Sequence, residues 1–292
     1  MSIAMDKKEQ FFHHGAKAMS KYLILDEEWY FCPLCMTGYR IGDIDKLTFE
    51  HVPPESIGGK EICLTCEDCN RKAGHRIDNH VHRRNWVISF AKAANGEDTY
   101  EGRVRVDMED ESINADLKVQ DGAFQFKVPT KYNNPQDKNQ LFDHLHALEK
   151  NNGWRDQSFK VRLILDSFSQ RRVDISDLKS AYLAAFAFFG YGYILPNTLD
   201  VIRKQIAHPE SEVLNGFSYR FKKPIPPERL LVAVSDPFEC LLVQIDDRFI
   251  FLPPMEGRSF NYNDINRHFS SIRTLHGRRY DFPDHLILQL DE

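Results

Sequence analysis

The chain has 292 residues and an ordinary apolar fraction of 42%, which fit one to three globular domains and exclude a disordered or fibrous protein. Its net charge of −5 excludes a protein that binds nucleic acid through an overall positive charge. The longest apolar run, around residues 182–195, is interrupted by glycines and is too short to span a bilayer. The N-terminus is charged where a signal peptide needs an apolar stretch, so we expect a soluble, intracellular protein of the cytoplasm, without membrane association.

The first predicted elements flank a segment that is rich in cysteine. Residues 6–22 carry apolar side chains at helical spacing, and polar residues around Gly96 mark a break in the chain. Five of the six cysteines lie between Cys32 and Cys69, a clustering that is typical of metal binding in an intracellular chain. We predict three parts, which are an N-terminal extension at 1–27, a metal-binding module at 28–95 and a further domain at 96–292.

The rest of the chain reads as helices mixed with antiparallel strands. Period-two alternation over 100–128 predicts a three-stranded meander. Apolar and aromatic residues three or four apart predict a long core helix over 174–194, with Asp174 as its N-cap. Further predicted elements are helices at 137–150 and 262–272 and strands at 159–166, 230–235, 239–245, 248–253 and 285–290. The expected fold class is α+β, with a small zinc-stapled ββα module followed by an α+β domain of antiparallel strands.

Two CxxC pairs indicate a structural zinc site. The pairs are Cys32 with Cys35 and Cys66 with Cys69. Zinc takes four such ligands in a tetrahedron, with Zn–S distances near ~2.3 Å. Cys63 leaves an alternative open, because it stands three residues before Cys66 and could form a pair with it. We favour Cys66 and Cys69, since they immediately precede Asn70.

Charge is unevenly distributed beyond the second cysteine pair. Residues 71–92 contain six Lys or Arg against one acid, whereas residues 98–121 contain eight acids against three bases. A local basic patch attracts phosphate over about one Debye length, roughly 8–10 Å. Charge alone supports a phosphate-binding patch and a solvated helix face equally.

The segments LTFEHVPPESIGGK and CNRKAGHRIDNHV extend the cysteine pairs into a longer ordered pattern. Residues 32–82, within a module of about 28–90, resemble the HNH endonuclease superfamily. The resemblance is to the subgroup with two CxxC pairs and an E-H-x-x-P…G-G…C-x-x-C-N…G…D layout. The matched positions are Cys32, Cys35, Glu50, His51, Pro54, Gly58, Gly59, Cys66, Cys69, Asn70, Gly74 and Asp78.

The resemblance implies a hairpin that carries the acid–histidine pair and a helix that begins near Cys69. It implies that Glu50 and Asn70 hold a catalytic divalent ion, Mg²⁺ or Mn²⁺, and that His51 deprotonates the attacking water. A hard cation neutralises charge that develops on the phosphate, and a neutral imidazole accepts a proton at neutral pH. The predicted nucleic-acid contacts are Arg71, Lys72 and Arg76, which would position the phosphate backbone.

The acid–histidine pair imposes a local demand on the hairpin. Glu50 and His51 are adjacent, so their side chains would point to opposite faces of a regular strand. A shared site therefore requires a bend or a β-bulge at this position, and bulges are frequent next to active sites.

Three hypotheses of function follow. The first is a metal-dependent endonuclease that hydrolyses phosphodiester bonds, with DNA favoured over RNA as its substrate. The second is a zinc-knuckle module that binds nucleic acid and is catalytically inactive; the joint presence of Glu50, His51 and Asn70 favours the enzyme. The third places the main activity after residue 95, where we find no catalytic signature. For residues 96–292 we predict target recognition, regulation or oligomerisation, including assembly into a homo-oligomer.

Overall fold

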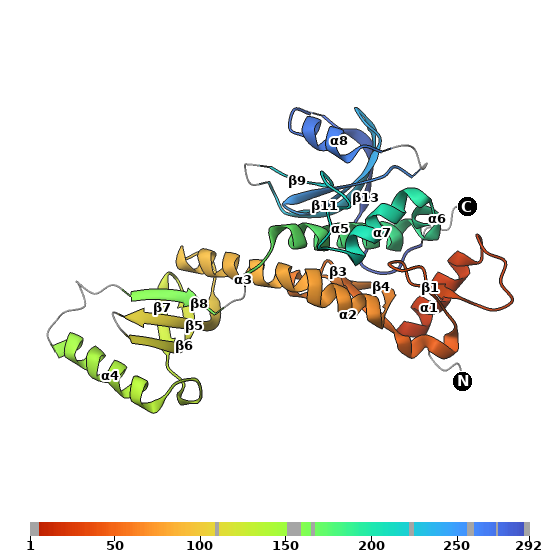
Figure 1. Cartoon of the computed structure of the whole chain (residues 1–292). Coiled ribbons are helices and arrows are strands. Elements are labelled where there is room, and N and C mark those ends of the chain that lie inside the picture. The colour runs from red at the N-terminus through yellow and green to blue at the C-terminus, as the bar shows by residue number, and fades with distance from the viewer. Residues whose placement is uncertain are drawn as a thin grey trace. The chain divides into compact units, whose positions relative to one another are not determined.

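A computed structural model of the whole chain shows helices and antiparallel sheets, which confirms the α+β fold class (Figure 1). The structure describes residues 6–108, 111–150, 159–164, 167–221, 225–255, 260–272 and 274–288. It divides into two compact units, one of residues 1–82 and 169–292 and one of residues 83–168. These boundaries differ from those expected at residues 28 and 96, because residues 169–292 share a unit with the cysteine-rich segment.

The N-terminal part of the first unit consists of short elements around two hairpins. A helix forms where apolar spacing predicted one, but it is shorter than the expected range of 6–22. Strand β1 pairs with β2, and β3 pairs with β4, both antiparallel. The elements are α1 (Lys7–Met19), β1 (Tyr30–Phe31), β2 (Gly38–Tyr39), a 3₁₀ turn (Ile41–Lys46), β3 (Leu47–Val52), a 3₁₀ turn (Glu55–Ile57), β4 (Lys60–Cys66), α2 (Glu67–Ala73), a π-helical turn (Gly74–Asp78) and α3 (Asn79–Ala94).

The C-terminal part of the first unit is an antiparallel sheet of five strands in the order β13-β10-β11-β12-β9. Helices α5 and α8 lie on opposite sides of this sheet (Figure 1). The predicted strand at 285–290 is not found over residues 285–288, and residues 289 and 290 lie outside the described residues. Strand β13 pairs with β10 and takes the edge position instead. The elements are α5 (Gln170–Phe189), α6 (Tyr191–Ile194), a 3₁₀ turn (Asn197–Leu199), α7 (Asp200–Ala207), β9 (Ser218–Arg220), β10 (Glu228–Asp236), β11 (Cys240–Asp246), β12 (Arg248–Leu252), α8 (Tyr262–Phe269) and β13 (His276–Asp281).

Helix α5 is the central element of the first unit. Every residue from Ile175 to Phe189 is buried, as expected for a helix that is covered on all sides. The prediction of Asp174 as the N-cap is wrong. The hydroxyl of Ser169 caps the helix by accepting from the Arg172 amide at 3.4 Å. Asp174 instead accepts from Gln170, one turn into the helix. No helix in the described residues is long and apolar enough to cross a membrane.

The second unit is built on a four-stranded antiparallel sheet in the order β7-β6-β5-β8. Strands β5, β6 and β7 form the meander that the alternation of apolar and polar residues predicted. Trp86 and Phe90, from the α3 residues that belong to this unit, pack edge-on against Tyr100. Trp86 is therefore partly buried and packs against the core of the unit. The elements are β5 (Tyr100–Met108), β6 (Glu111–Gln120), β7 (Ala123–Lys127), a 3₁₀ turn (Thr130–Tyr132), α4 (Pro135–Lys150) and β8 (Phe159–Leu163).

Candidate active site

Four cysteine sulfurs converge in the first unit. Their Sγ atoms lie within 4.8 Å of one another, and the Sγ atoms of Cys35 and Cys66 are 3.8 Å apart. A tetrahedron with Zn–S arms of ~2.3 Å has edges of about 3.8 Å, so the cluster has the size that zinc requires. Cys63 does not belong to the cluster; it is fully buried in β4, and the alternative pairing is excluded. The cluster consists of the four cysteines that the sequence pairs: Cys32, Cys35, Cys66 and Cys69.

The first cysteine pair sits in a tight turn between β1 and β2. The amide of Met36 donates to the Cys32 carbonyl at 2.8 Å, and the amide of Cys32 donates to the Thr37 carbonyl at 2.9 Å. Met36 is left-handed, with φ of 58°, which bends the chain sharply enough to bring both sulfurs to one side. The second pair is brought in by the start of α2, where the Cys69 amide donates to the Cys66 sulfur at 3.5 Å.

Hydrogen bonds among the four thiols shift their pKa values in opposite directions. Hydrogen bonding with Cys32 lowers the pKa of the Cys66 thiol to about 6, and it also lowers the pKa of Cys35 far below its ordinary value. Hydrogen bonding with Cys35 raises the pKa of Cys32 in return. Four crowded thiolates repel one another unless a cation sits among them, and zinc binding deprotonates such thiols. The cluster can therefore hold a zinc ion.

The β3–β4 hairpin contains a break in register at the acid–histidine pair. Glu50 pairs with Cys63, but His51 pairs with Glu61, so Ile62 lies opposite no residue. This break in register is a β-bulge with its extra residue on β4. The register shift falls at the step where a bulge was expected, but its extra residue lies on β4 and not on the strand that carries Glu50 and His51.

His51 lies at the surface of this hairpin. Its side chain is 32% exposed, and its Nε2 atom is 3.9 Å from Oε1 of Glu61 across the strand pair. The other oxygen of Glu61 pairs with Lys7 of α1 at 2.6 Å. The imidazole is thus open to solvent while an acid held by a second element limits where it turns.

Asn70 is anchored to the strand that carries His51. Its Nδ2 atom donates to the Thr48 hydroxyl at 2.9 Å and to the Phe49 carbonyl at 3.2 Å. A carbonyl can only accept, so the Phe49 contact fixes which end of the amide faces β3. The Oδ1 atom of Asn70 points away from these contacts and accepts no hydrogen bond from the described residues. Asn70 therefore offers a free amide oxygen, which is a suitable ligand for a hard cation.

Glu50 is placed differently from what the resemblance implied. It is only 3% exposed. Its Oε1 atom pairs with the Lys179 ammonium at 2.7 Å, and its Oε2 atom accepts from the Thr65 hydroxyl at 3.1 Å. Both carboxylate oxygens thus have protein partners, and as placed Glu50 does not fit a ligand of the catalytic ion.

Lys179 is the residue of this region that sequence reasoning missed. It lies on α5, 129 residues after Glu50, and also pairs with Asp78 at 2.5 Å. Asp78 additionally accepts from the Ser176 hydroxyl at 2.6 Å, so both of its carboxylate oxygens have protein partners. One signal was available, because Asp177 and Lys179 are the charged residues within the buried stretch from Ile175 to Phe189.

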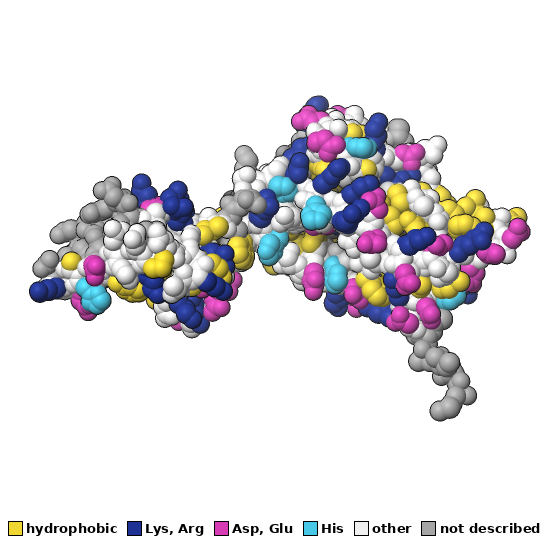
Figure 2. All heavy atoms as spheres, turned by 60° about the horizontal axis from the view of Figure 1, so that its bottom comes forward, with side chains coloured by type: hydrophobic (Ala, Val, Ile, Leu, Met, Phe, Trp, Pro, Cys, Tyr) yellow, Lys and Arg dark blue, Asp and Glu magenta, His cyan; other side chains and the backbone are white. Residues whose placement is uncertain are grey.

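The three predicted nucleic-acid contacts are all exposed. Arg71 and Lys72 both pair with Asp68 on the same helix, at 3.1 and 2.6 Å. Arg76 donates to the Ala207 carbonyl at 3.4 Å. Exposed pairs of this kind are weak and exchange readily, so the side chains stay accessible to phosphate. Figure 2 shows one face of the molecule, on which Lys, Arg and His side chains are interspersed with acids.

The loop that follows His51 depends on two glycines. Gly58 has φ of 74°, and a Cβ on Gly59 would lie 1.4 Å from the Pro53 carbonyl oxygen. We expect Gly59→Ala to lower the free energy of unfolding by about 3 kcal/mol or more, because backbone must move to make room. Chemical denaturation measures this. Gly42→Ala is the control, since a Cβ there meets nothing within 4 Å; an equal loss in both variants would contradict the expectation.

Comparison with known proteins identifies the segment that carries this geometry. Residues 32–85 match the family model described as HNH endonuclease. No curated protein and no solved structure matches the chain. The matched range contains the four clustered cysteines, the bulged hairpin and the anchored asparagine. Residues 32–85 of this chain therefore form a module of the HNH endonuclease family.

Proposed function

We propose that the chain is a metal-dependent endonuclease that hydrolyses phosphodiester bonds in DNA. The observation that carries the proposal is the free amide oxygen of Asn70, whose Nδ2 atom is anchored to the same strand that presents the partly exposed His51. A protein that only binds nucleic acid through its zinc knuckles has no need of this combination. Family membership supports a nuclease at a coarser level, because it specifies neither the substrate nor the catalytic residues.

His51 serves as the general base in this proposal. The neutral imidazole accepts a proton from water, and Glu61 stabilises the imidazolium that forms, since its carboxylate lies 3.9 Å from Nε2. Asn70 would hold Mg²⁺ or Mn²⁺ through Oδ1. When bound, such an ion neutralises charge on the phosphate and on the leaving oxygen. Arg71, Lys72 and Arg76 would contact the phosphate backbone at exposed positions.

Replacement of Asn70 tests the ion-binding half of the proposal. We expect Asn70→Ala to reduce plasmid cleavage by roughly 100-fold and to weaken Mn²⁺ binding, because the variant removes the α2 amide oxygen that the contacts to β3 leave available for an ion. Mn²⁺ binding is followed by electron paramagnetic resonance, and zinc content is measured alongside. Asn79→Ala, in the helix that follows, is the matched control. Unchanged cleavage by Asn70→Ala would remove this residue from the site.

One observation favours a second candidate function. Glu50, which the resemblance assigns to the metal, is engaged by Lys179 and Thr65. A chain that has lost a metal ligand in this way could bind nucleic acid through its zinc knuckles without cleaving it. DNA retention in a gel-shift assay, with no cleavage under Mg²⁺ or Mn²⁺ and no effect of Asn70→Ala, would establish this alternative.

A further inference from the structure

A buried ammonium stands at the junction of the HNH module and helix α5. Lys179 is fully buried, and its Nζ atom lies 2.7 Å from Glu50 and 2.5 Å from Asp78. Burial disfavours the charged form, but the carboxylates of Asp78 and Glu50 outweigh burial and raise the pKa of Lys179 above its ordinary value. The group is therefore a fixed positive charge between two acids of the HNH module.

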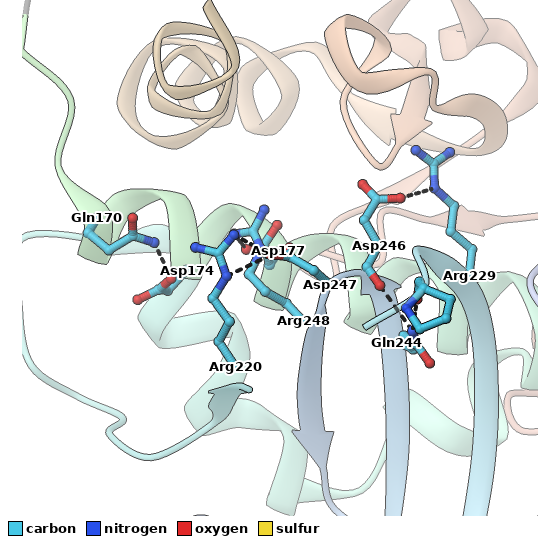
Figure 3. A network of polar contacts seen from close by, with 10 residues as sticks. Gln170, Asp174, Asp177, Arg220, Arg229, Gln244, Asp246, Asp247 and Arg248 are labelled. Atoms are coloured by element: carbon cyan, nitrogen blue, oxygen red, sulfur yellow. Dashed lines mark hydrogen bonds and ion pairs between the residues drawn. The ribbon is translucent and has the colours of Figure 1, made fainter. Parts of the chain in front are cut away.

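The opposite face of α5 is tied to the C-terminal sheet. Asp177, two residues before Lys179, pairs with Arg248 of β12, and both are buried (Figure 3). Helix α5 is thus held on one side by an ion pair to the sheet and on the other by an ion pair to the β3 strand. A helix fixed in this way presents Lys179 at a defined position.

The C-terminal sheet also contacts the loop that follows His51 in the chain. Arg229 of β10 donates to the carbonyls of Gly58 and Ile57 at 2.8 and 2.5 Å, and it pairs with Asp246 at 3.2 Å (Figure 3). Strand β3 is therefore held by Lys179 at the residue before His51 and by Arg229 in the loop after it.

We propose that Lys179 is a positioning residue of the HNH site, which holds Glu50 as its counter-ion, keeps Glu50 from ligating the divalent ion, and so fixes the backbone at His51. The inference rests on the proposed function, since the ion and the base are those of the proposed endonuclease. Glu50 is the chain neighbour of His51, so a displacement of the Glu50 side chain moves the strand that carries the base. The site is in this sense completed by a residue outside the matched range of 32–85.

Two measurements on four proteins test the inference: wild type, Glu50→Gln, Lys179→Met and the double variant. Mn²⁺ binding is measured by electron paramagnetic resonance, and unfolding is measured by a thermal melt. We expect Glu50→Gln to change the Kd for Mn²⁺ by no more than about twofold, because Glu50 is not a ligand. An increase of more than about tenfold would overturn the proposal.

The melts test the ion pair without ion or substrate. We expect Lys179→Met to lower Tm by roughly 10 °C, because it leaves two acids without their cation. The double variant should recover part of this loss, since residues in direct contact do not contribute additively. Strictly additive losses would contradict the pairing. Lys204→Met, an exposed lysine on α7, is the control and should leave Tm within about 1 °C.

A conservative variant separates positioning from folding. Lys179→Arg keeps the positive charge, so the protein should fold with its zinc. Its planar guanidinium does not place the charge where the compact ammonium does. We expect its kcat to fall by about tenfold at unchanged KM, because the base is misplaced while the binding surface is intact. Wild-type kcat in this variant would overturn the positioning role. If the wild type cleaves nothing, the proposed endonuclease fails, whereas the melts still decide whether Lys179 holds Glu50.

Discussion

Replacement of Cys66 and Cys69 by serine is expected to abolish zinc binding and to unfold the β3–β4 hairpin. The two residues supply half of the sulfur cluster, and Cys66 also ends β4 and caps α2. Structural zinc contributes apparent binding free energies of about 10–16 kcal/mol in small zinc modules, which is as large as the whole stability of an ordinary domain. The other cysteine pair has little regular structure of its own, because β1 and β2, which flank it, are two residues long each.

Zinc content and thermal unfolding measure this result together. We expect about one zinc per wild-type chain and none in the double serine variant, which should also lose cooperative unfolding of the HNH module. Cys63→Ala is the matched control, because Cys63 lies in the same strand but outside the cluster. It should retain the metal. Full zinc occupancy in the serine variant, or loss of zinc in the alanine control, would show that other residues bind the ion.

The cysteine ligands could be predicted from the sequence because their spacing is local. A CxxC turn brings two sulfurs together within four residues, and the chain between Cys35 and Cys66 needs only to form a hairpin that returns. A break in register at Glu50 and His51 was predictable for the same reason, since adjacent side chains alternate across a strand. Alternation likewise predicted the meander of the second unit.

The partners of Glu50 could not be predicted in this way. Lys179 reaches it across 129 residues, and no periodicity in the sequence encodes which face of α5 meets β3. The resemblance pointed to a metal at Glu50, but a carboxylate can also take an ammonium as its counter-ion, as Glu50 does with Lys179. Burial decided between the two, because the all-round apolar helix α5 covers this edge of the hairpin and carries its own cation.

The predicted domain boundaries rested on composition and missed the packing of the chain's two ends. Residues 169–292 share a unit with residues 1–82. The hydroxyl of Tyr182 donates to the Pro33 carbonyl at 2.8 Å, inside the first zinc knuckle, and Tyr191 donates to the Phe31 carbonyl at 2.5 Å. Truncation after residue 95 would remove these contacts as well as Lys179. The role in target recognition, regulation or oligomerisation that the sequence suggests for residues 96–292 stays a prediction.

Removal of the His51 imidazole is expected to have the largest effect on cleavage. General bases contribute about 10²–10⁴-fold to rate, so His51→Ala should reduce plasmid cleavage by that factor in the presence of Mg²⁺ or Mn²⁺. The variant should keep its zinc and its Tm, because the side chain is 32% exposed and its nearest charged partner is Glu61 at 3.9 Å. Loss of activity with intact structure separates a chemical role from a folding role.

Addition of free imidazole to His51→Gly provides a sharper form of the same test. A cavity at the position of the ring lets imidazole act as an external base, so cleavage should rise with its concentration and require the neutral form. His14→Ala, at an exposed position of α1, is the control and should cleave at the wild-type rate. Wild-type cleavage by His51→Ala would assign the base to another residue. If His51→Gly loses both cleavage and zinc, and imidazole does not restore cleavage, His51 supports the hairpin and not the reaction.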